Sequence, residues 1–233
     1  MLYEAILFDM DGVIINTHQA VTSFWQKWAE VHQVELSQAD FQQNIYGCPA
    51  NHTLDVLFPA LNTDERDAIM ADMTAYEINQ TYRAVKGVLA FLRELKQEAI
   101  PTALVTSGEH WKVDAVLTQL ELNGIFDATV TVADIRHGKP SPECYLLGAE
   151  RLQRSPERCI VFEDAISGVK AAVAAGALCI GVQPWNEAPL LEAGARYVVP
   201  DFISVKLELF PENGHLNLQL GSHSSLLLQK EGQ

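Results

Sequence analysis

Short apolar runs alternate with amphipathic stretches through most of the chain, and this pattern predicts strands that alternate with helices. The predicted strands are residues 5–8, 102–106, 129–133, 159–162, 178–182 and 197–199. The predicted helices between the later strands are residues 88–97, 111–122, 142–152 and 167–175. Strands connected by crossover helices form a parallel sheet with helices on both faces. The sequence therefore predicts an α/β fold with a doubly wound parallel sheet.

Residues 17–85 have a different pattern, which is helical without a strand signal. The first helical stripe consists of Val21, Phe24, Trp25, Trp28 and Ala29. Further helices are expected over residues 37–44, 53–57 and 64–82. Asp64 is the expected N-cap of the last one. We therefore expect a helical domain, residues 17–85, inserted into a core domain formed by residues 1–16 and 86–210.

The C-terminal part of the chain allows two interpretations. Residues 205–209 and 216–220 both alternate between apolar and polar positions around a turn sequence at 211–214, which indicates a small hairpin. A closing helix over residues 204–210 is the alternative. Residues 211–233 are set apart as a tail, and its polar end from residue 221 is expected to be frayed.

Composition narrows the class of protein. The chain of 233 residues is 48% apolar and 20% charged, as expected for a globular protein with a real core. Its net charge of −14 disfavours nucleic acid as a partner, because no basic stripe is available to neutralise phosphates. A small anionic substrate still fits, since one lysine and a metal ion can form a local positive site.

The expected setting is cytoplasmic and reducing. Four scattered cysteines without Cys-X-X-Cys spacing are expected to be small buried hydrophobic residues. The N-terminus lacks the pattern of a signal peptide, and no apolar run is long enough for a membrane span. A monomer is the default expectation.

Two carboxylates, Asp9 and Asp11, come directly after the first predicted strand and are followed by Gly12. Residues two apart on an extended backbone project to the same side, so both carboxylates should share one site. Like charges this close repel each other unless a cation or a shared proton relieves them. An isolated Asp-X-Asp sequence is usually a solvated turn, so its interpretation depends on the rest of the chain.

This sequence resembles the nucleophile motif of the haloacid dehalogenase superfamily, most of whose members are aspartate-based phosphohydrolases. Thr106 ends a predicted strand at the position of the family's phosphate-binding Ser or Thr. Lys139, within Gly-Lys-Pro-Ser-Pro, is similar to the phosphate-binding lysine, and Glu163 with Asp164 resembles the metal-binding acidic pair. The motifs occur in the family's order and span nearly the whole chain. Independently, Asp9, Thr106 and Glu163 all lie at carboxyl ends of predicted parallel strands, where such sheets bind ligands.

The resemblance implies a phosphatase that uses Mg²⁺ and forms an aspartyl-phosphate. Asp9 would be the nucleophile, and Asp11 would protonate the leaving oxygen and then deprotonate water. The phosphoryl oxygens would be bound by Thr106, Ser107 and Lys139. The metal ligands would be the Asp9 side chain, the Asp11 backbone carbonyl and Asp164, with Glu163 acting through water.

The helical insertion resembles the family's cap, which can close over the site, exclude water and supply substrate contacts. The candidate contacts are Thr17, His18, Trp25, Gly47, Asn51, His52 and Glu77 in the insertion, with Glu109 and His110 in the core. Taken singly, tryptophans on a helical stripe are more typical of a core, and lone histidines are more typical of a surface.

Within the superfamily, the chain is similar to the group that holds β-phosphoglucomutase and small sugar- or polyol-phosphate phosphatases. The mutase's cap offers a histidine, an arginine and a lysine, where this chain has Val21, Ala50 and the lysine-free residues 76–80. Losing these cations favours a phosphatase, and Glu77 would repel a second phosphate. A mutase remains the main alternative, and a non-catalytic metabolite sensor or a dehalogenase fits less well.

Overall fold

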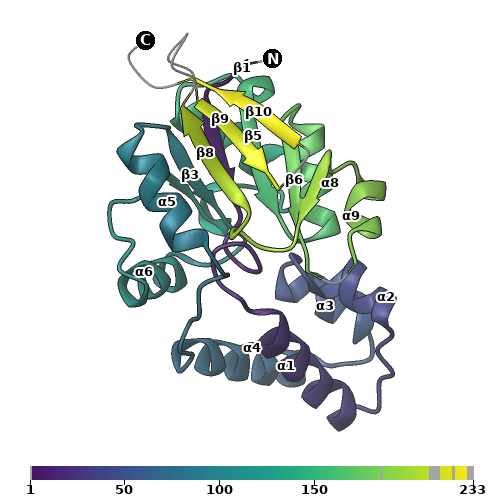
Figure 1. The fold of residues 1–233 in the computed structure, drawn as a ribbon. Helices are drawn as coiled ribbons and strands as arrows, with labels where there is room; N and C mark the ends of the chain where they lie inside the picture. The colour runs from purple at the N-terminus through teal and green to yellow at the C-terminus, as the bar shows by residue number, and fades with distance from the viewer. Residues whose placement is uncertain (1, 185, 210–215, 222–223, 230–233) are drawn as a thin grey trace.

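The computed structural model describes residues 2–184, 186–209, 216–221 and 224–229, and its centre is a six-stranded parallel sheet (Figure 1). The strands, in spatial order, are β4 (Ala128–Val130), β3 (Thr102–Val105), β2 (Ala5–Phe8), β5 (Cys159–Glu163), β6 (Leu178–Val182) and β7 (Tyr197–Val199). The strand β2 lies between β3 and β5 and is buried along its whole length. The predicted α/β fold is confirmed.

Helices cover both faces of this sheet, as its near-continuous apolar strands require. The helices α5 (Val88–Gln97) and α6 (His110–Gln119) pack on one face, where Phe8, Phe91 and Phe162 form an aromatic cluster. The helices on the other face are α7 (Glu143–Arg151), α8 (Ile166–Ala174) and α9 (Ala188–Ala193). The short helix α9 was not predicted from the sequence.

The inserted helices lie beyond the carboxyl ends of the sheet strands (Figure 1). They are α1 (His18–Val31), α2 (Gln38–Asp40), a π-helical turn (Phe41–Ile45), α3 (Ala50–Leu57) and α4 (Thr63–Ile78). They share a hydrophobic cluster of their own, whose most buried members include Leu54, Phe58 and Ile69. We call residues 17–85 the cap and the sheet with its helices the core.

The start and end of α4 and the end of β4 differ from the sequence prediction. The N-cap of α4 is Asn62 rather than Asp64, because Asn62 and Glu65 each accept a hydrogen bond from the other's backbone amide. The same helix ends at Ile78, before the expected residue 82. The strand β4 ends at Val130 because the next residues form a 3₁₀ turn.

The chain ends form a second, four-stranded sheet rather than a frayed tail. Its strands, in order, are β1 (Leu2–Tyr3), β10 (Ser224–Leu228), β9 (Leu216–Leu220) and β8 (Val205–Leu209). The antiparallel pairing of β8 with β9 supports the hairpin and shows that the closing helix was wrong, while the expected turn at 211–214 lies outside the described residues. The expected fraying was also wrong for residues 224–228, because β10 pairs with β9 and β1 and buries Leu228 completely, while residues 222–223 and 230–233 lie outside the described residues.

Within the described residues, no helix has the length and apolar character needed to cross a membrane.

Candidate active site

Three of the expected site residues stand at the carboxyl ends of neighbouring strands. The Asp9 amide donates to the Phe162 carbonyl at 3.0 Å, and the Thr106 amide donates to the Val130 carbonyl at 2.9 Å. The sheet ladder therefore continues one residue beyond β2 and β3. Glu163 is the last residue of β5. The sheet thus fixes the backbone under all three side chains, which is the rigid support that a catalytic group needs.

The carboxylates of Asp9, Glu163 and Asp164 form a buried cluster with Lys139. One carboxylate oxygen from each acid lies within 4.8 Å of the others. The Lys139 ammonium donates to Asp9 Oδ1 at 2.5 Å and to Glu163 Oε1 at 2.6 Å. Burial raises the pKa of Asp9 well above its usual range, although Lys139 opposes this shift. Burial disfavours the Lys139 ammonium, but Asp9 and Glu163 outweigh it and raise the lysine's pKa.

Both carboxylate oxygens of Glu163 accept hydrogen bonds. Its Oε1 accepts from the Tyr145 hydroxyl at 2.8 Å as well as from Lys139. Its Oε2 accepts from the next two backbone amides at 2.9 and 3.0 Å. A Cβ at Gly168 in α8 would overlap the Glu163 carboxylate, so the glycine makes the space for it. With both oxygens engaged, Glu163 is suited to acting on a metal through water.

Asp9 and Asp164 offer the oxygens that a hard divalent cation such as Mg²⁺ prefers, so the donor set fits this ion. Gly12 allows Asp164 to approach the loop that carries Asp11. Its backbone has φ +79°, and a Cβ there would overlap the Asp164 carboxylate. The loop and Asp164 can therefore share one ion.

A cavity of about 800 Å³ separates the cap from these residues. Asp9, Asp11, Asp164, Thr106 and Ser107 line its core side, whereas Lys139 and Glu163 lie buried behind Asp9. The candidate substrate residues that line it are Thr17, His18, Trp25, Gly47, Asn51, Glu77 and Glu109. The cavity thus brings most of the predicted residues to one place.

His52 and His110 do not line this cavity. His52 is exposed on α3, and the His110 Nε2 lies 3.2 Å from the Thr131 hydroxyl. Both were expected as substrate contacts from their place in the sequence. Their direction could not be fixed from helical spacing alone.

Two expected cap residues contact the core directly. The His18 Nε2 lies 2.9 Å from Asp164 Oδ2, and the His18 ring packs edge-on against Tyr46. Burial lowers the pKa of His18, but the hydrogen bond to Asp164 and the negative charges of Asp164 and Asp11 together outweigh it and raise the value. A Cβ at Gly47 would overlap Ala165, so the glycine permits close approach of cap and core. Both residues therefore serve the cap–core contact as well as the cavity.

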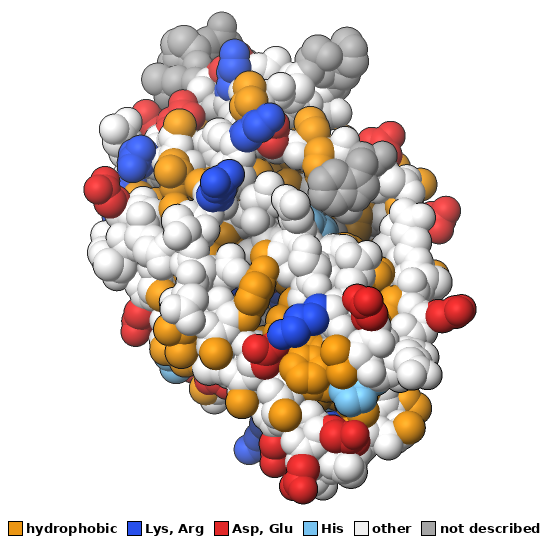
Figure 2. All heavy atoms as spheres, turned by 90° about the horizontal axis from the view of Figure 1, so that it is seen from below, with side chains coloured by type: hydrophobic (Ala, Val, Ile, Leu, Met, Phe, Trp, Pro, Cys, Tyr) orange, Lys and Arg blue, Asp and Glu red, His pale blue; other side chains and the backbone are white. Residues whose placement is uncertain are grey.

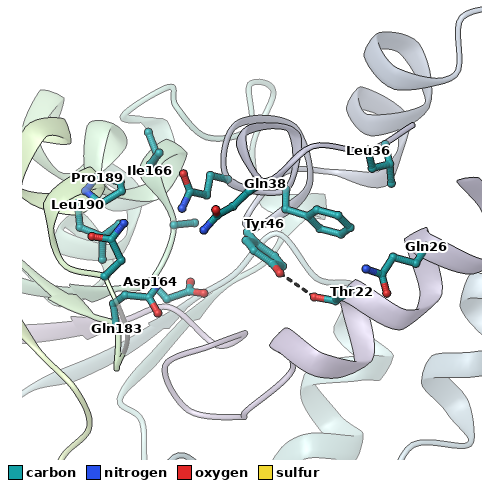
Figure 3. A pocket seen from close by; sticks show the side chains of 14 residues that line it. Thr22, Gln26, Leu36, Gln38, Tyr46, Asp164, Ile166, Gln183, Pro189 and Leu190 are labelled. Atoms are coloured by element: carbon teal, nitrogen blue, oxygen red, sulfur yellow. Dashed lines mark hydrogen bonds between the residues drawn. The ribbon is translucent and has the colours of Figure 1, made fainter. Parts of the chain in front are cut away.

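A smaller cavity of about 360 Å³ lies between the cap and the core and shares Asp164 and Tyr46 with the larger one (Figure 3). Figure 3 shows amide side chains from both sides around it, including Gln38 of the cap and Gln183 of the core. The Thr22 hydroxyl and the Tyr46 hydroxyl are hydrogen-bonded at 2.7 Å on its cap side. Asp164 therefore borders open space on two sides.

Lys112 is a site residue that the sequence did not reveal. Its ammonium donates to both Asp11 oxygens, at 3.0 and 3.1 Å, and to Glu77 Oε1 at 2.7 Å. Burial disfavours the ammonium, but Asp11 and Glu77 outweigh it and raise the pKa of Lys112. The one available signal was its place beside Val113 and Val116 on the buried face of α6. Tyr145 was missed in the same way, although it follows the Lys139 motif closely.

Comparisons with known proteins agree with this geometry. The sequence model of the haloacid dehalogenase-like hydrolases matches residues 3–176. A phosphorylated carbohydrates phosphatase from Thermotoga maritima is 34% identical over 84% of this chain and 94% of its own. Hexitol phosphatase A from Escherichia coli is 31% identical over 82% of this chain and 88% of its own. A solved structure described as a candidate β-phosphoglucomutase from T. maritima has 33% identity and a TM-score of 0.63, covering 84% of this chain and 94% of that one.

Proposed function

The chain belongs to the haloacid dehalogenase-like hydrolases and is a phosphatase, and on this premise we propose that it hydrolyses a small sugar or polyol phosphate with Mg²⁺ through an aspartyl-phosphate. The observation that carries the proposal is the buried cluster in which Asp9 meets Lys139 and two further carboxylates, at the floor of a cavity of about 800 Å³. A cavity of this size suits a small metabolite.

In the proposed reaction, Asp9 attacks phosphorus and the bond to the leaving oxygen breaks, while Asp11 gives that oxygen a proton. Asp11 then takes a proton from the water that attacks phosphorus, which releases phosphate and restores Asp9. Thr106, the Ser107 amide and Lys139 bind phosphoryl oxygens as charge develops. Asp9, Asp164 and the Asp11 carbonyl would hold Mg²⁺, which would supply further neutralisation of the phosphoryl charge.

The lining of the cavity supports an uncharged, hydroxylated substrate body. Thr17, Asn51, Thr74 and Thr81 offer neutral hydrogen-bonding groups there. The relatives named above act on phosphorylated carbohydrates and hexitol phosphates, which agrees with this chemistry. On the face seen in Figure 2, Lys and Arg side chains stand singly among uncharged and acidic ones. That distribution suits a small substrate better than a polyanion.

A phosphosugar mutase is the second candidate, and Arg83 is the observation in its favour. Arg83 lines the cavity and is exposed, so it offers a cation for a second phosphate. Against this, Val21 and Ala50 line the cavity at positions where the mutase has cationic or imidazole groups. Conversion of a sugar 1-phosphate to the 6-phosphate with a bisphosphate primer identifies a mutase.

The test is phosphate release from a panel of sugar and polyol phosphates, with and without Mg²⁺. We expect Asp9→Asn to abolish release and leave the fold intact, because the two side chains are nearly equal in size. Asp72→Asn, which alters an exposed cap carboxylate bound to Lys27, is the matched control and should keep full activity. Release that survives in Asp9→Asn, or that does not need Mg²⁺, contradicts the proposal.

A further inference from the structure

The geometry points to Lys112 as a positioning residue that couples the closed cap to Asp11, and we propose that Glu77 is the cap group through which this coupling acts. The inference rests on the proposed function, because Asp11 is the acid and base of that reaction. We call the three residues the Glu77–Lys112–Asp11 bridge.

The bridge joins three segments that are far apart in the sequence. Asp11 lies in the loop after β2, Lys112 lies on α6 of the core, and Glu77 lies in the last turn of the cap helix α4. The three contacts of the ammonium are 2.7, 3.0 and 3.1 Å long, so each of its protons has an acceptor. The cap and the acid-base residue therefore meet at one buried cation.

The lysine of the bridge is more buried than its two carboxylates, which leaves the carboxylates accessible to a substrate. The Lys112 side chain is 9% exposed, whereas those of Asp11 and Glu77 are 30% and 27% exposed. Both carboxylates line the large cavity, so each keeps an edge open to a substrate. Lys112 also lines the cavity but is the more buried partner, so it fixes the two carboxylates from the wall between them.

The helix α6 also holds the chain segment that leads from the cap back to the core. The Gln119 side chain accepts from the Tyr82 amide at 3.0 Å and donates to the Gln80 carbonyl at 3.2 Å. The Tyr82 hydroxyl donates to the Glu77 carbonyl at 3.0 Å. With Lys112 at one end and Gln119 at the other, α6 sets where α4 ends relative to Asp11.

Opening of the cap would break the bridge at one particular bond. Asp11 and Lys112 both belong to the core, so their contacts remain when the cap moves. The bond between Lys112 and Glu77 crosses from core to cap and would be lost. A charge-assisted hydrogen bond in a protected place stabilises more than an exposed pair does. The closed cap is therefore the state in which Lys112 has all its partners and Asp11 is held most firmly.

The kinetic test compares Lys112→Met, Lys112→Arg and Glu77→Gln with the wild type on its best substrate. Lys112→Met should lower kcat about tenfold or more, as expected for loss of a charge-assisted contact to a reacting group. Lys112→Arg should recover part of kcat, because it restores the charge. Glu77→Gln should act mainly on KM. The double variant Glu77→Gln/Lys112→Met should lose no more kcat/KM than Lys112→Met alone, because both changes disrupt the same Glu77–Lys112–Asp11 bridge.

The matched control is Lys27→Met, which removes an exposed cap lysine bound to Asp72 at 2.7 Å and should leave kcat and KM unchanged. Equal kcat/KM for Lys112→Met and the wild type overturns the inference. So does a strictly additive double variant, or an Arg variant as slow as the Met variant with an unchanged melting temperature.

Hydrogen exchange gives a readout that does not depend on activity. In the presence of inorganic phosphate, Glu77→Gln and Lys112→Met should both raise amide exchange over residues 77–82, and Lys27→Met should not. Unchanged exchange in the first two variants overturns the bridge. A wild type that releases no phosphate from any substrate instead refutes the proposed function, and the exchange result still decides whether the bridge holds the cap.

Discussion

Removing Lys139 should weaken the fold most when divalent cations are absent. Lys139→Met leaves the buried Asp9 and Glu163 carboxylates without their shared cation. Glu163 keeps its bonds from the Tyr145 hydroxyl and two backbone amides. Asp9 loses the ammonium that compensates its charge and, with a pKa already raised by burial, should take up a proton. The penalty therefore falls mainly on Asp9.

The size of the effect follows from these contacts. Breaking a buried ion pair by removing one partner costs about 3–5 kcal/mol. Because Glu163 stays satisfied and Asp9 can become neutral, we expect the lower end, about 3 kcal/mol. With an m-value of about 3 kcal/mol/M for a chain of this size, the urea midpoint should fall by about 1 M.

The assay is urea unfolding in EDTA and again in excess Mg²⁺. The ion should replace part of the missing positive charge, so the difference between variant and wild type should shrink when Mg²⁺ is added. Lys96→Met is the matched control, because Lys96 forms an exposed ion pair with Asp127 at 2.7 Å, whose loss should cost under about 1 kcal/mol. A variant midpoint within 0.3 M of wild type in EDTA, or a difference that Mg²⁺ leaves unchanged, would refute the reasoning.

Three further predictions concern the same site. Burial raises the pKa values of Asp9 and Asp164. Without metal, the contribution of the two protonated carboxyl groups to stability is therefore present below about pH 4 and is lost as the pH rises through the raised values. Melting temperatures measured between pH 4 and 8 should show that Mg²⁺ stabilises the protein more at the higher pH. Gly12→Ala should cost about 3 kcal/mol in urea unfolding and abolish phosphate release, whereas Gly124→Ala, with a similar φ of +76° but no atom within 4 Å, should cost only about 1 kcal/mol. Tyr145→Phe should lower the free energy of unfolding by about 1–3 kcal/mol and lower kcat, because it removes one hydrogen-bond donor to the buried Glu163 carboxylate. A kcat equal to that of the wild type would contradict this prediction.

The sequence was informative where the position of a residue is set by the strand that it directly follows. Asp9, Thr106 and Glu163 each follow an apolar run, and parallel strands necessarily bring their carboxyl ends to one edge. The resemblance to the haloacid dehalogenase superfamily, built on these positions, is confirmed by the family match. The α/β core was predictable for the same reason, because its six strands and all its helices except the short α9 each had a local signal in the sequence.

The parts that were missed depend on packing between distant segments. In the sequence Lys112 looks like an ordinary helix lysine, and only the packing of α6 shows that it contacts Glu77 of the cap. The second sheet was missed because its inner strand β10 pairs with β1, from the other end of the chain, as well as with β9. The polar residues after position 221 dominated the sequence prediction, although Leu226 and Leu228 alternate with exposed Leu227 and face inward, Leu228 being fully buried.

Two cap residues, His18 and Glu77, reach two different carboxylates of the core, Asp164 and Asp11, and this has a mechanistic consequence. His18 contacts Asp164, which the proposed metal requires, while Glu77 contacts Asp11 through Lys112. One cap contact therefore acts on the residue that would bind the ion, and the other acts on the residue that would move the proton. Because both contacts cross from cap to core, opening the cap releases both at once. A closed cap is thus the state in which the proposed metal ligand, Asp164, and the proposed acid-base group, Asp11, are held in place together, so the proposed reaction requires a substrate small enough to fit beneath the cap.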